Sequence, residues 1–228
     1  MRHRARTFLR RKMKFEAIIF DLDGVICHTD NFHYLAWKAI ADQYGIPFDR
    51  MVNDRLRGVS RRDSLEIILE NGGRSCSEEE KQRMAEEKNE IYRGFLAEMT
   101  PGDLSPETWE TLNALKVRGV RLAIGSSSKN AGLILSRLGL ESFFDAVADG
   151  TEISRSKPDP EVFLLAAEKL RVSPRRAAVV EDAAAGIEAA KRGGFYAIGI
   201  GSAAGYEASD GRISRLSDLL SVVQGPLL

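Results

Sequence analysis

The sequence predicts an α/β protein with a doubly wound parallel sheet and an inserted helical segment. Two observations lead to this prediction. Short apolar runs that end in polar residues recur along the chain and alternate with segments of helical periodicity. Between residues 29 and 100 this alternation stops, and helical segments follow one another without a convincing strand. The chain has 228 residues, which is enough for one core domain with a smaller insertion.

Five apolar runs are predicted to form the sheet. They are "FEAIIFD" (15–21), "VRLAIGS" (120–126), "RAAVVED" (176–182), "FYAIGIG" (195–201) and, more weakly, "FFDAVADG" (143–150). Each is short and mostly apolar, as expected for a strand buried on both faces. The helical segments between them are 106–119, 129–140, 159–171 and 184–194. Strands that alternate with helices favour a parallel sheet with helices on both faces.

The inserted segment is predicted to form a helical cap. Three stretches within it have helical character: 31–45, 60–73 and 77–99. Because the insertion follows the first strand directly, we expect it above the carboxyl end of that strand, where open α/β sheets bind ligands. The predicted organisation is a disordered basic leader (1–13), an α/β core (14–28 and 101–228) and a helical cap (29–100).

Composition disfavours a membrane protein and a nucleic-acid-binding protein. No apolar run approaches the roughly 20 residues that cross a bilayer. Residues 1–12 hold six Lys/Arg and no acidic residue, so the rest of the chain carries a net charge of −6, which argues against a nucleic-acid surface. Such a leader can bind nucleic acid or target an organelle, but an unstructured extension without a catalytic role is favoured. Two lone cysteines, Cys27 and Cys76, suit a reducing cytoplasm.

Acidic pairs end two of the predicted strands. Asp21 and Asp23 follow the first strand, and Glu181 and Asp182 end the strand at 176–182. If these strand ends are neighbours, four carboxylates gather at one rim and form an oxygen-rich site suited to Mg²⁺. An isolated Asp pair is more often a turn or a helix cap. Acidic pairs at two separate strand ends favour the metal site.

Two further motifs supply groups that suit a phosphate. "GSSSKN" (125–130) leads from a strand into a helix and offers hydroxyls, backbone N–H groups and a helix N-terminus, although such turns are also ordinary caps. "SKPDP" (156–160) places Lys157 before a helix. An ammonium there would offset part of the carboxylate charge and help a phosphoryl group to enter.

Taken in order, "DLDGV", "GSSSKN", "KPDP" and "VVEDAAAGI" resemble the four motifs of the haloacid dehalogenase superfamily, over residues 15–200. The resemblance implies that Asp21 is a nucleophile that becomes an aspartyl phosphate. It implies that Asp23 is the general acid/base, with its backbone carbonyl on Mg²⁺. The other implied roles are phosphoryl binding by Ser126, Ser127 and Lys157, and a metal site made by Asp21, Asp23, Glu181 and Asp182. Carboxylates at i and i+2 of an extended chain share one side, as this division of roles requires.

Three segments, two of them wholly or partly in the insertion, narrow the resemblance to the β-phosphoglucomutase family. They are "FDLDGVICHTDNFHYLAWKAIA" and "LRGVSRRDSLEIIL", together with "GSSSKN". The resemblance implies that His33 hydrogen-bonds Asp23 and that Thr29, in the hinge, helps to orient it. Contacts to the sugar and to a distal phosphate are implied for Trp37, Gly58, Val59, Ser60, Arg61, Ser128, Lys129 and Asn130. From the residues alone, Trp37 and His33 could equally pack inside the cap, and Arg61 would more often belong to a solvated face.

Three positions depart from that family's common pattern. His28 stands where Asp is common, Arg57 where Lys is common, and Ala183 where a small polar residue is common. None removes a catalytic group, but the sugar preference could shift.

The implied activity is a Mg²⁺-dependent isomerisation of β-D-glucose 1-phosphate and glucose 6-phosphate. It would use phosphorylated Asp21 and glucose 1,6-bisphosphate, which is both intermediate and activator. The alternative is a sugar- or polyol-phosphate phosphatase of the same fold. A dehalogenase is disfavoured, since Asp23 and a Mg²⁺ site would have no role. A non-catalytic binding protein with a basic tail would leave the four ordered motifs unexplained. We expect a cytoplasmic monomer that acts on a small sugar phosphate, without a nucleic-acid or membrane partner.

Overall fold

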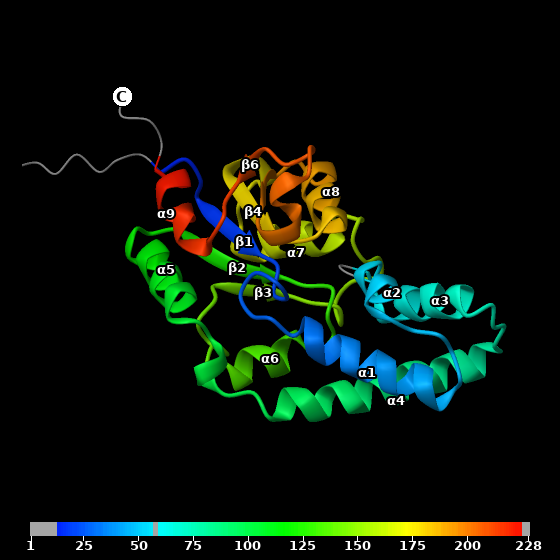
Figure 1. Cartoon of the computed structure of the whole chain (residues 1–228). Helices are drawn as coiled ribbons and strands as arrows, with labels where there is room; N and C mark the ends of the chain where they lie inside the picture. The colour runs from blue at the N-terminus through cyan, green and yellow to red at the C-terminus, as the bar shows by residue number, and fades with distance from the viewer. Residues whose placement is uncertain (1–12, 57–58, 225–228) are drawn as a thin grey trace, which may run out of the picture.

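The computed structural model describes residues 13–56 and 59–224, which fold around a six-stranded sheet. Its strands are β1 (Ala17–Phe20), β2 (Arg121–Gly125), β3 (Ala146–Ala148), β4 (Ala177–Glu181), β5 (Tyr196–Gly199) and β6 (Gly211–Arg212). They lie in the order β3-β2-β1-β4-β5-β6, and every pair is parallel. The predicted fold class is therefore confirmed, with β1 and β4 side by side in the middle of the sheet (Figure 1).

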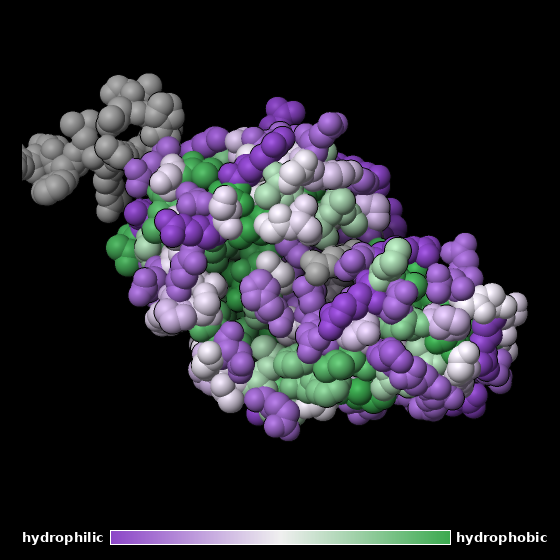
Figure 2. Space-filling model, viewed as in Figure 1, coloured by the Kyte–Doolittle hydropathy of each residue, from purple (hydrophilic) through white to green (hydrophobic). Residues whose placement is uncertain are grey.

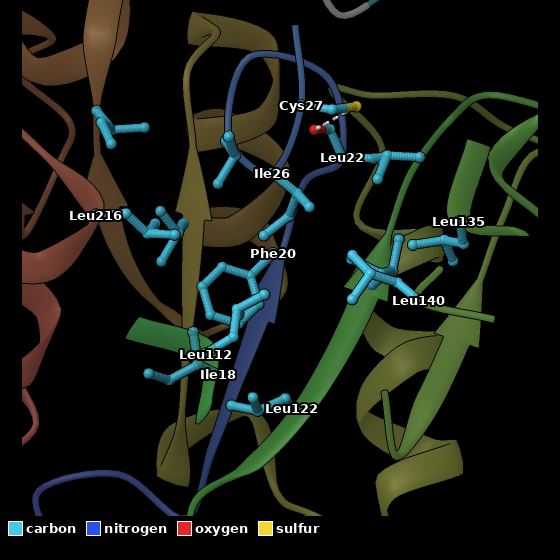
Figure 3. Packing of buried hydrophobic residues seen from close by; sticks show 14 of the residues in the cluster. Ile18, Phe20, Leu22, Ile26, Cys27, Leu112, Leu122, Leu135, Leu140 and Leu216 are labelled. Atoms are coloured by element: carbon cyan, nitrogen blue, oxygen red, sulfur yellow. Dashed lines mark hydrogen bonds between the residues drawn. The ribbon is translucent and has the colours of Figure 1, made fainter. Parts of the chain in front are cut away.

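Alternate side chains of β1 pack on opposite faces of the sheet, as the two-residue period of a strand requires. Ile18 and Phe20 pack with Leu112 and Leu122 on one face (Figure 3), whereas Ile19 belongs to the cluster on the other face. Fully burying each of these large apolar side chains contributes about 1.5–3 kcal/mol. The continuous apolar run of β1 thus holds the strand at the centre of the core.

Helices cover both faces of the sheet. They are α5 (Pro106–Val117), α6 (Ala131–Arg137), α7 (Glu161–Leu170), α8 (Ala184–Arg192) and α9 (Leu219–Val222). Buried residues of α5, α6 and α9 join the first cluster, and those of α7 and α8 join the second. Sequence signals fix the ends of α5: the Ser105 hydroxyl accepts from the Thr108 N–H at its start, and Gly119 follows its end with φ +79°.

Among the described residues, four α-helices lie between β1 and α5 in the sequence, beyond one end of the sheet (Figure 1). They are α1 (Asp30–Gln43), α2 (Arg50–Asp54), α3 (Arg61–Asn71) and α4 (Glu78–Ala97). They have an apolar cluster of their own, which includes Trp37, Ile40, Leu65 and Met84. All four fall inside the predicted cap, although the division of the chain into domains stays a prediction.

The surface of this helical segment is partly apolar. Figure 2 shows hydrophobic side chains gathered over α1 and α4, and Leu35 on α1 is 39% exposed. No helix in the described part of the chain is both long enough and apolar enough to cross a membrane.

Several short elements were not predicted. These are β6, α2, α9 and four 3₁₀ helices: Pro101–Asp103, Pro174–Arg176, Gly201–Gly205 and Leu216–Asp218. They have two to five residues, and none coincides with one of the predicted apolar runs or helical segments. The predicted leader is described only at Met13, which pairs with Gln224, and residues 1–12 lie outside the described residues.

Candidate active site

Three acidic side chains meet at the carboxyl ends of the two central strands. Asp21 directly follows β1, Glu181 ends β4, and Asp182 comes next in the chain. Because β1 and β4 are parallel neighbours, these residues lie at the same edge of the sheet. One carboxylate oxygen from each of the three residues lies within 4.8 Å of the other two, and all three residues are buried. The structure thus brings together three of the four predicted carboxylates.

Lys157 forms ion pairs with two members of this cluster. Its Nζ donates to Asp21 Oδ1 at 2.5 Å and to Glu181 Oε2 at 2.7 Å. Burial and the charge of Asp21 raise the pKa of Glu181 to about 8, and burial also raises the pKa of Asp21, although Lys157 opposes both shifts. Lys157 thus contacts two of the three clustered carboxyl groups. Carboxylate oxygens gathered this closely fit a hard divalent cation such as Mg²⁺.

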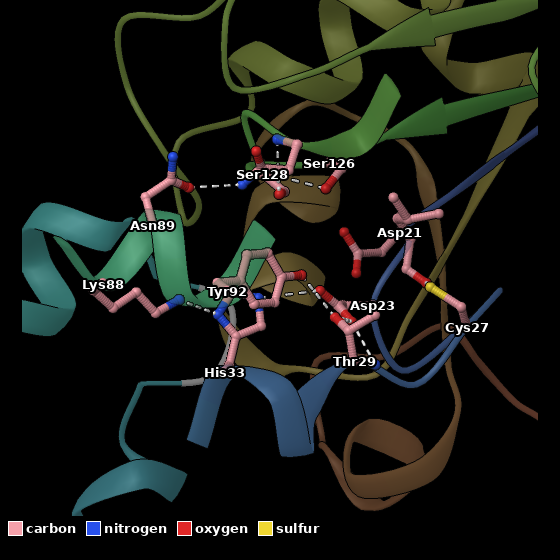
Figure 4. A network of polar contacts seen from close by, with 12 residues as sticks. Asp21, Asp23, Cys27, Thr29, His33, Lys88, Asn89, Tyr92, Ser126 and Ser128 are labelled. Carbon is pink, nitrogen blue, oxygen red and sulfur yellow. Dashed lines mark hydrogen bonds and ion pairs between the residues drawn. The ribbon is translucent and has the colours of Figure 1, made fainter. Parts of the chain in front are cut away.

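Asp23 lies outside this cluster and has its own partners (Figure 4). The Thr29 N–H donates to Asp23 Oδ1 at 3.0 Å, and the Thr29 hydroxyl donates to the same oxygen. His33 Nε2 lies 3.5 Å from Asp23 Oδ2. Burial alone would raise the pKa of Asp23, but the contacts with His33 and Thr29 outweigh it and lower the pKa. The pKa values of the two carboxyl groups thus shift in opposite directions, upward for Asp21 and downward for Asp23.

The three "GSSSKN" serines differ in their hydrogen bonds. The Ser126 hydroxyl accepts from the Ser128 N–H at 3.1 Å, and the Ser128 hydroxyl accepts from the Asn130 N–H at 3.2 Å. The Ser127 hydroxyl is buried and has no hydrogen-bond partner among the described residues. An orphaned polar atom in such a loop suits a ligand with hydrogen-bonding oxygens, such as a phosphate.

A cavity of about 520 Å³ joins these groups. Its lining includes Asp21, Asp23, Lys157, Ser127 and, from the inserted helices, Arg61. The volume is typical of pockets for small molecules. The cavity therefore combines two aspartate side chains, a serine hydroxyl and two cationic side chains.

Comparison with known proteins identifies the family. A family model described as haloacid dehalogenase-like hydrolase matches residues 15–194. The chain belongs to the haloacid dehalogenase-like hydrolase family. It is 45% identical over 206 residues to a β-phosphoglucomutase of Bacillus subtilis, and the aligned residues cover 90% of this chain and 91% of that protein. The chain is also 35% identical to a phosphorylated carbohydrates phosphatase of Thermotoga maritima, over 80% of this chain and 83% of that protein.

A solved structure of a haloacid dehalogenase-like relative is also similar. The crystal structure of β-phosphoglucomutase from Clostridium difficile has a TM-score of 0.84 and 40% sequence identity. The match covers 90% of this chain and 93% of that chain. The likeness therefore includes the inserted helices as well as the sheet that defines the haloacid dehalogenase-like fold.

The remaining predicted residues take up varied positions around the cavity. Val59, Ser60, Lys129 and Asn130 are all part of its lining. Ser60 also caps α3, because its hydroxyl accepts from the Asp63 N–H. Trp37 lines the cavity but is only 2% exposed and packs in the apolar cluster of the inserted helices. Its predicted sugar contact stays a prediction. Gly58 and Arg57 lie outside the described residues.

Sequence reasoning missed two buried residues of α4. Lys88 Nζ lies 2.8 Å from His33 Nδ1, and the Tyr92 hydroxyl lies 2.9 Å from Thr29 Oγ1. Burial, together with the charge of Arg61, lowers the pKa of Lys88 to about 7. The spacing held a signal: the buried residues of α4 recur every four residues, and Lys88 is the charged member of that series.

A glycine of α8 makes room for the carboxylate cluster, and this predicts a matched pair of variants. A Cβ at Gly186 would lie 2.0 Å from Glu181 Oε2, whereas a Cβ at Gly132, in α6, would meet nothing within 4 Å. Gly186→Ala should therefore lower the free energy of unfolding by about 1–3 kcal/mol and reduce activity, because Glu181 must move. Gly132→Ala should be neutral or stabilise by up to about 1 kcal/mol. Thermal unfolding compares the two; equal stabilisation would contradict the packing argument.

Proposed function

We propose that the protein is a Mg²⁺-dependent isomerase that interconverts β-D-glucose 1-phosphate and glucose 6-phosphate. The observation that carries this proposal is the composition of the cavity. The Asp21–Lys157 pair lies in its lining together with a second cation, Arg61, on an inserted helix. An enzyme that moves a phosphoryl group between two ends of one sugar must bind two phosphates at once. The identity of 45% to the β-phosphoglucomutase of Bacillus subtilis supports the same activity.

Asp21 is the proposed nucleophile. Its carboxylate attacks phosphorus, the bond between phosphorus and the sugar oxygen breaks, and an aspartyl phosphate forms. Lys157 holds Asp21 Oδ1 and adds positive charge beside the phosphoryl oxygens. Ser126 and Ser127 supply hydroxyls for the same group. Asp21, Glu181, Asp182 and the backbone carbonyl of Asp23 would hold Mg²⁺, which when bound offsets the charge of the phosphoryl oxygens.

Asp23 is the proposed general acid and base. Protonated Asp23 gives its proton to the departing sugar oxygen, and ionised Asp23 later takes a proton from the attacking hydroxyl. Thr29 and His33 hold its carboxylate in place. The pair of steps is balanced, since each transfer restores the protonation state that the next transfer needs.

The inserted helices are proposed to bind the sugar and the distal phosphate. Contacts are expected from His33, Trp37, Gly58, Val59, Ser60, Arg61, Ser128, Lys129 and Asn130. Glucose 1,6-bisphosphate reorients within the cavity and returns its other phosphate to Asp21, so it acts as both intermediate and activator. Exclusion of water by the helical cap protects the aspartyl phosphate from hydrolysis.

We also propose the domain division given above and a cytoplasmic monomer. Cys27 and Cys76 are both free thiols, which suits a reducing compartment. A sugar-phosphate phosphatase remains the second candidate. It is favoured by the 35% identity to a phosphorylated carbohydrates phosphatase of Thermotoga maritima.

Arg61→Ala separates the two candidates. Loss of charge-assisted hydrogen bonds costs about 1.5–3 kcal/mol, so isomerase efficiency should fall by roughly 10- to 100-fold. Release of inorganic phosphate should fall less, because the Asp21–Lys157 site is intact. The measurement is glucose 6-phosphate formed against phosphate released, from β-glucose 1-phosphate with Mg²⁺ and trace glucose 1,6-bisphosphate.

A control variant is Arg55→Ala, which removes an exposed arginine paired with Glu70 at 3.8 Å. It should leave both rates unchanged. If the wild type releases phosphate stoichiometrically and forms no glucose 6-phosphate, the protein is a phosphatase. If the wild type isomerises and Arg61→Ala does not change the product ratio, Arg61 does not hold the distal phosphate.

A further inference from the structure

A buried tyrosine contacts Thr29, one of the residues that hold Asp23. Tyr92, on α4, is 1% exposed, and its hydroxyl lies 2.9 Å from Thr29 Oγ1 (Figure 4). Thr29 immediately precedes α1 and is fully buried. Three side chains, Tyr92, Thr29 and Asp23, therefore form one continuous line of hydrogen bonds from α4 to the loop after β1.

The direction of these hydrogen bonds follows from the number of protons available. The Thr29 hydroxyl has a single proton, and an ionised Asp23 can only accept. Since that proton goes to Asp23 Oδ1, the Thr29 oxygen must accept from the Tyr92 hydroxyl. Burial and the charge of Asp23 raise the pKa of Tyr92, which keeps the phenol protonated and able to donate.

The two oxygens of Asp23 consequently differ. Oδ1 receives two donors from Thr29, the backbone N–H at 3.0 Å and the hydroxyl. Oδ2 has the longer contact to His33 Nε2 at 3.5 Å. A proton on Oδ1 would have to displace two donors, whereas a proton on Oδ2 competes only with the longer contact to His33.

We propose that Tyr92 is a positioning residue that keeps the Thr29 hydroxyl pointed at Asp23 Oδ1, so that Oδ2 is the oxygen that carries the transferred proton. This inference rests on the proposed role of Asp23 as the general acid and base. As the bond between phosphorus and the sugar oxygen breaks, the proton passes from Oδ2 to that oxygen. Tyr92 and Thr29 keep their own protons throughout, so no further proton acceptor is needed.

Packing alone would be a different role for Tyr92, and the two roles can be separated. The centroids of the Tyr92 and His33 rings lie 4.0 Å apart, and Lys88 Nζ lies 4.4 Å from the centroid of the Tyr92 ring. Tyr92→Phe retains the ring and these contacts and removes only the hydroxyl. The variant therefore tests the hydrogen bond to Thr29 with little change in packing.

The leaving group supplies the decisive readout. A sugar oxygen leaves poorly and needs a proton, whereas acetate leaves well without one. Tyr92→Phe should slow phosphorylation of Asp21 by glucose 1,6-bisphosphate by about three- to tenfold, and phosphorylation by acetyl phosphate by less than about twofold. Tyr196→Phe removes a hydroxyl that donates to the backbone oxygen of Asp210 at 2.9 Å, and should change neither rate.

A second variant tests the route through Thr29. Thr29→Val removes the hydroxyl through which Tyr92 acts on Asp23. Adding Tyr92→Phe to Thr29→Val should therefore lower the rate of Asp21 phosphorylation by glucose 1,6-bisphosphate by less than about a further twofold. Equal loss with both phosphate donors, no loss with either, or independent losses in the double variant would overturn the inference. Phosphorylation of Asp21 is common to a mutase and a phosphatase. The Tyr92 result can therefore be obtained even if the wild type does not isomerise, which is the separate test of the proposed function.

Discussion

Asp21→Asn is expected to abolish both isomerisation and phosphate release while the fold and Mg²⁺ binding largely survive. An amide cannot attack phosphorus, and none of the neighbouring carboxylates occupies the same place at the end of β1. Asparagine has nearly the same shape, and Lys157 keeps its ion pair with Glu181 at 2.7 Å. The loss should therefore be chemical rather than structural.

The experiment measures glucose 6-phosphate, inorganic phosphate and covalently bound phosphate in wild type and variant. Thermal unfolding with and without Mg²⁺ checks the fold and the metal site. Asp42→Asn is a matched control, because Asp42 is exposed on α1 and pairs with Lys38. Covalent phosphate on another residue of an active Asp21→Asn protein would show that Asp21 is not the nucleophile.

Asp23→Asn is expected to lower isomerisation by 10²- to 10⁴-fold, the usual contribution of general acid–base catalysis. An asparagine oxygen can still accept from the Thr29 N–H and hydroxyl, so the local structure should persist. Its amide group, however, can neither give a proton to the sugar oxygen nor remove one from the attacking hydroxyl. Both halves of the proposed reaction lose their proton transfer.

The choice of phosphate donor again separates chemistry from structure. Phosphorylation of Asp21 by acetyl phosphate should be much less impaired than isomerisation, since acetate leaves without a proton. Wild-type protein and Asp42→Asn provide the reference rates. If isomerisation falls by less than tenfold, another group performs the proton transfer.

Much of the fold follows from local patterns in the sequence. The five predicted runs contain β1 to β5, because a strand buried on both faces needs a continuous apolar run. The strand β6 escaped prediction, since its two residues are too few to show a period and it owes its place to pairing with β5. Contacts far apart in the sequence decide such elements, and a single sequence does not display them.

The candidate site was predictable where motif and strand end coincide. Asp21, Glu181, Asp182 and Lys157 meet as their motifs indicated. Lys88 and Tyr92 were missed because they come from a helix, where a buried polar residue resembles a packed one until its partner is known. Their partners, His33 and Thr29, lie 55 and 63 residues away in the sequence. Only the tertiary structure brings these groups together.

The helix α4 contacts two separate parts of the cavity. Lys88 and Tyr92 contact His33 and Thr29, whereas Asn89 and Arg93 hydrogen-bond the side chain of Asn130 in the "GSSSKN" loop at 3.0 and 3.4 Å.

These four residues of α4 are neighbours on successive turns of one helix, so a single rigid displacement of α4 would alter both sets of contacts together. Thermodynamic linkage makes such an arrangement reciprocal. A ligand that draws the loop against α4 would therefore also act on the contacts of Lys88 and Tyr92 with His33 and Thr29. By the same free energy, a ligand that fixes those contacts would strengthen binding at the loop.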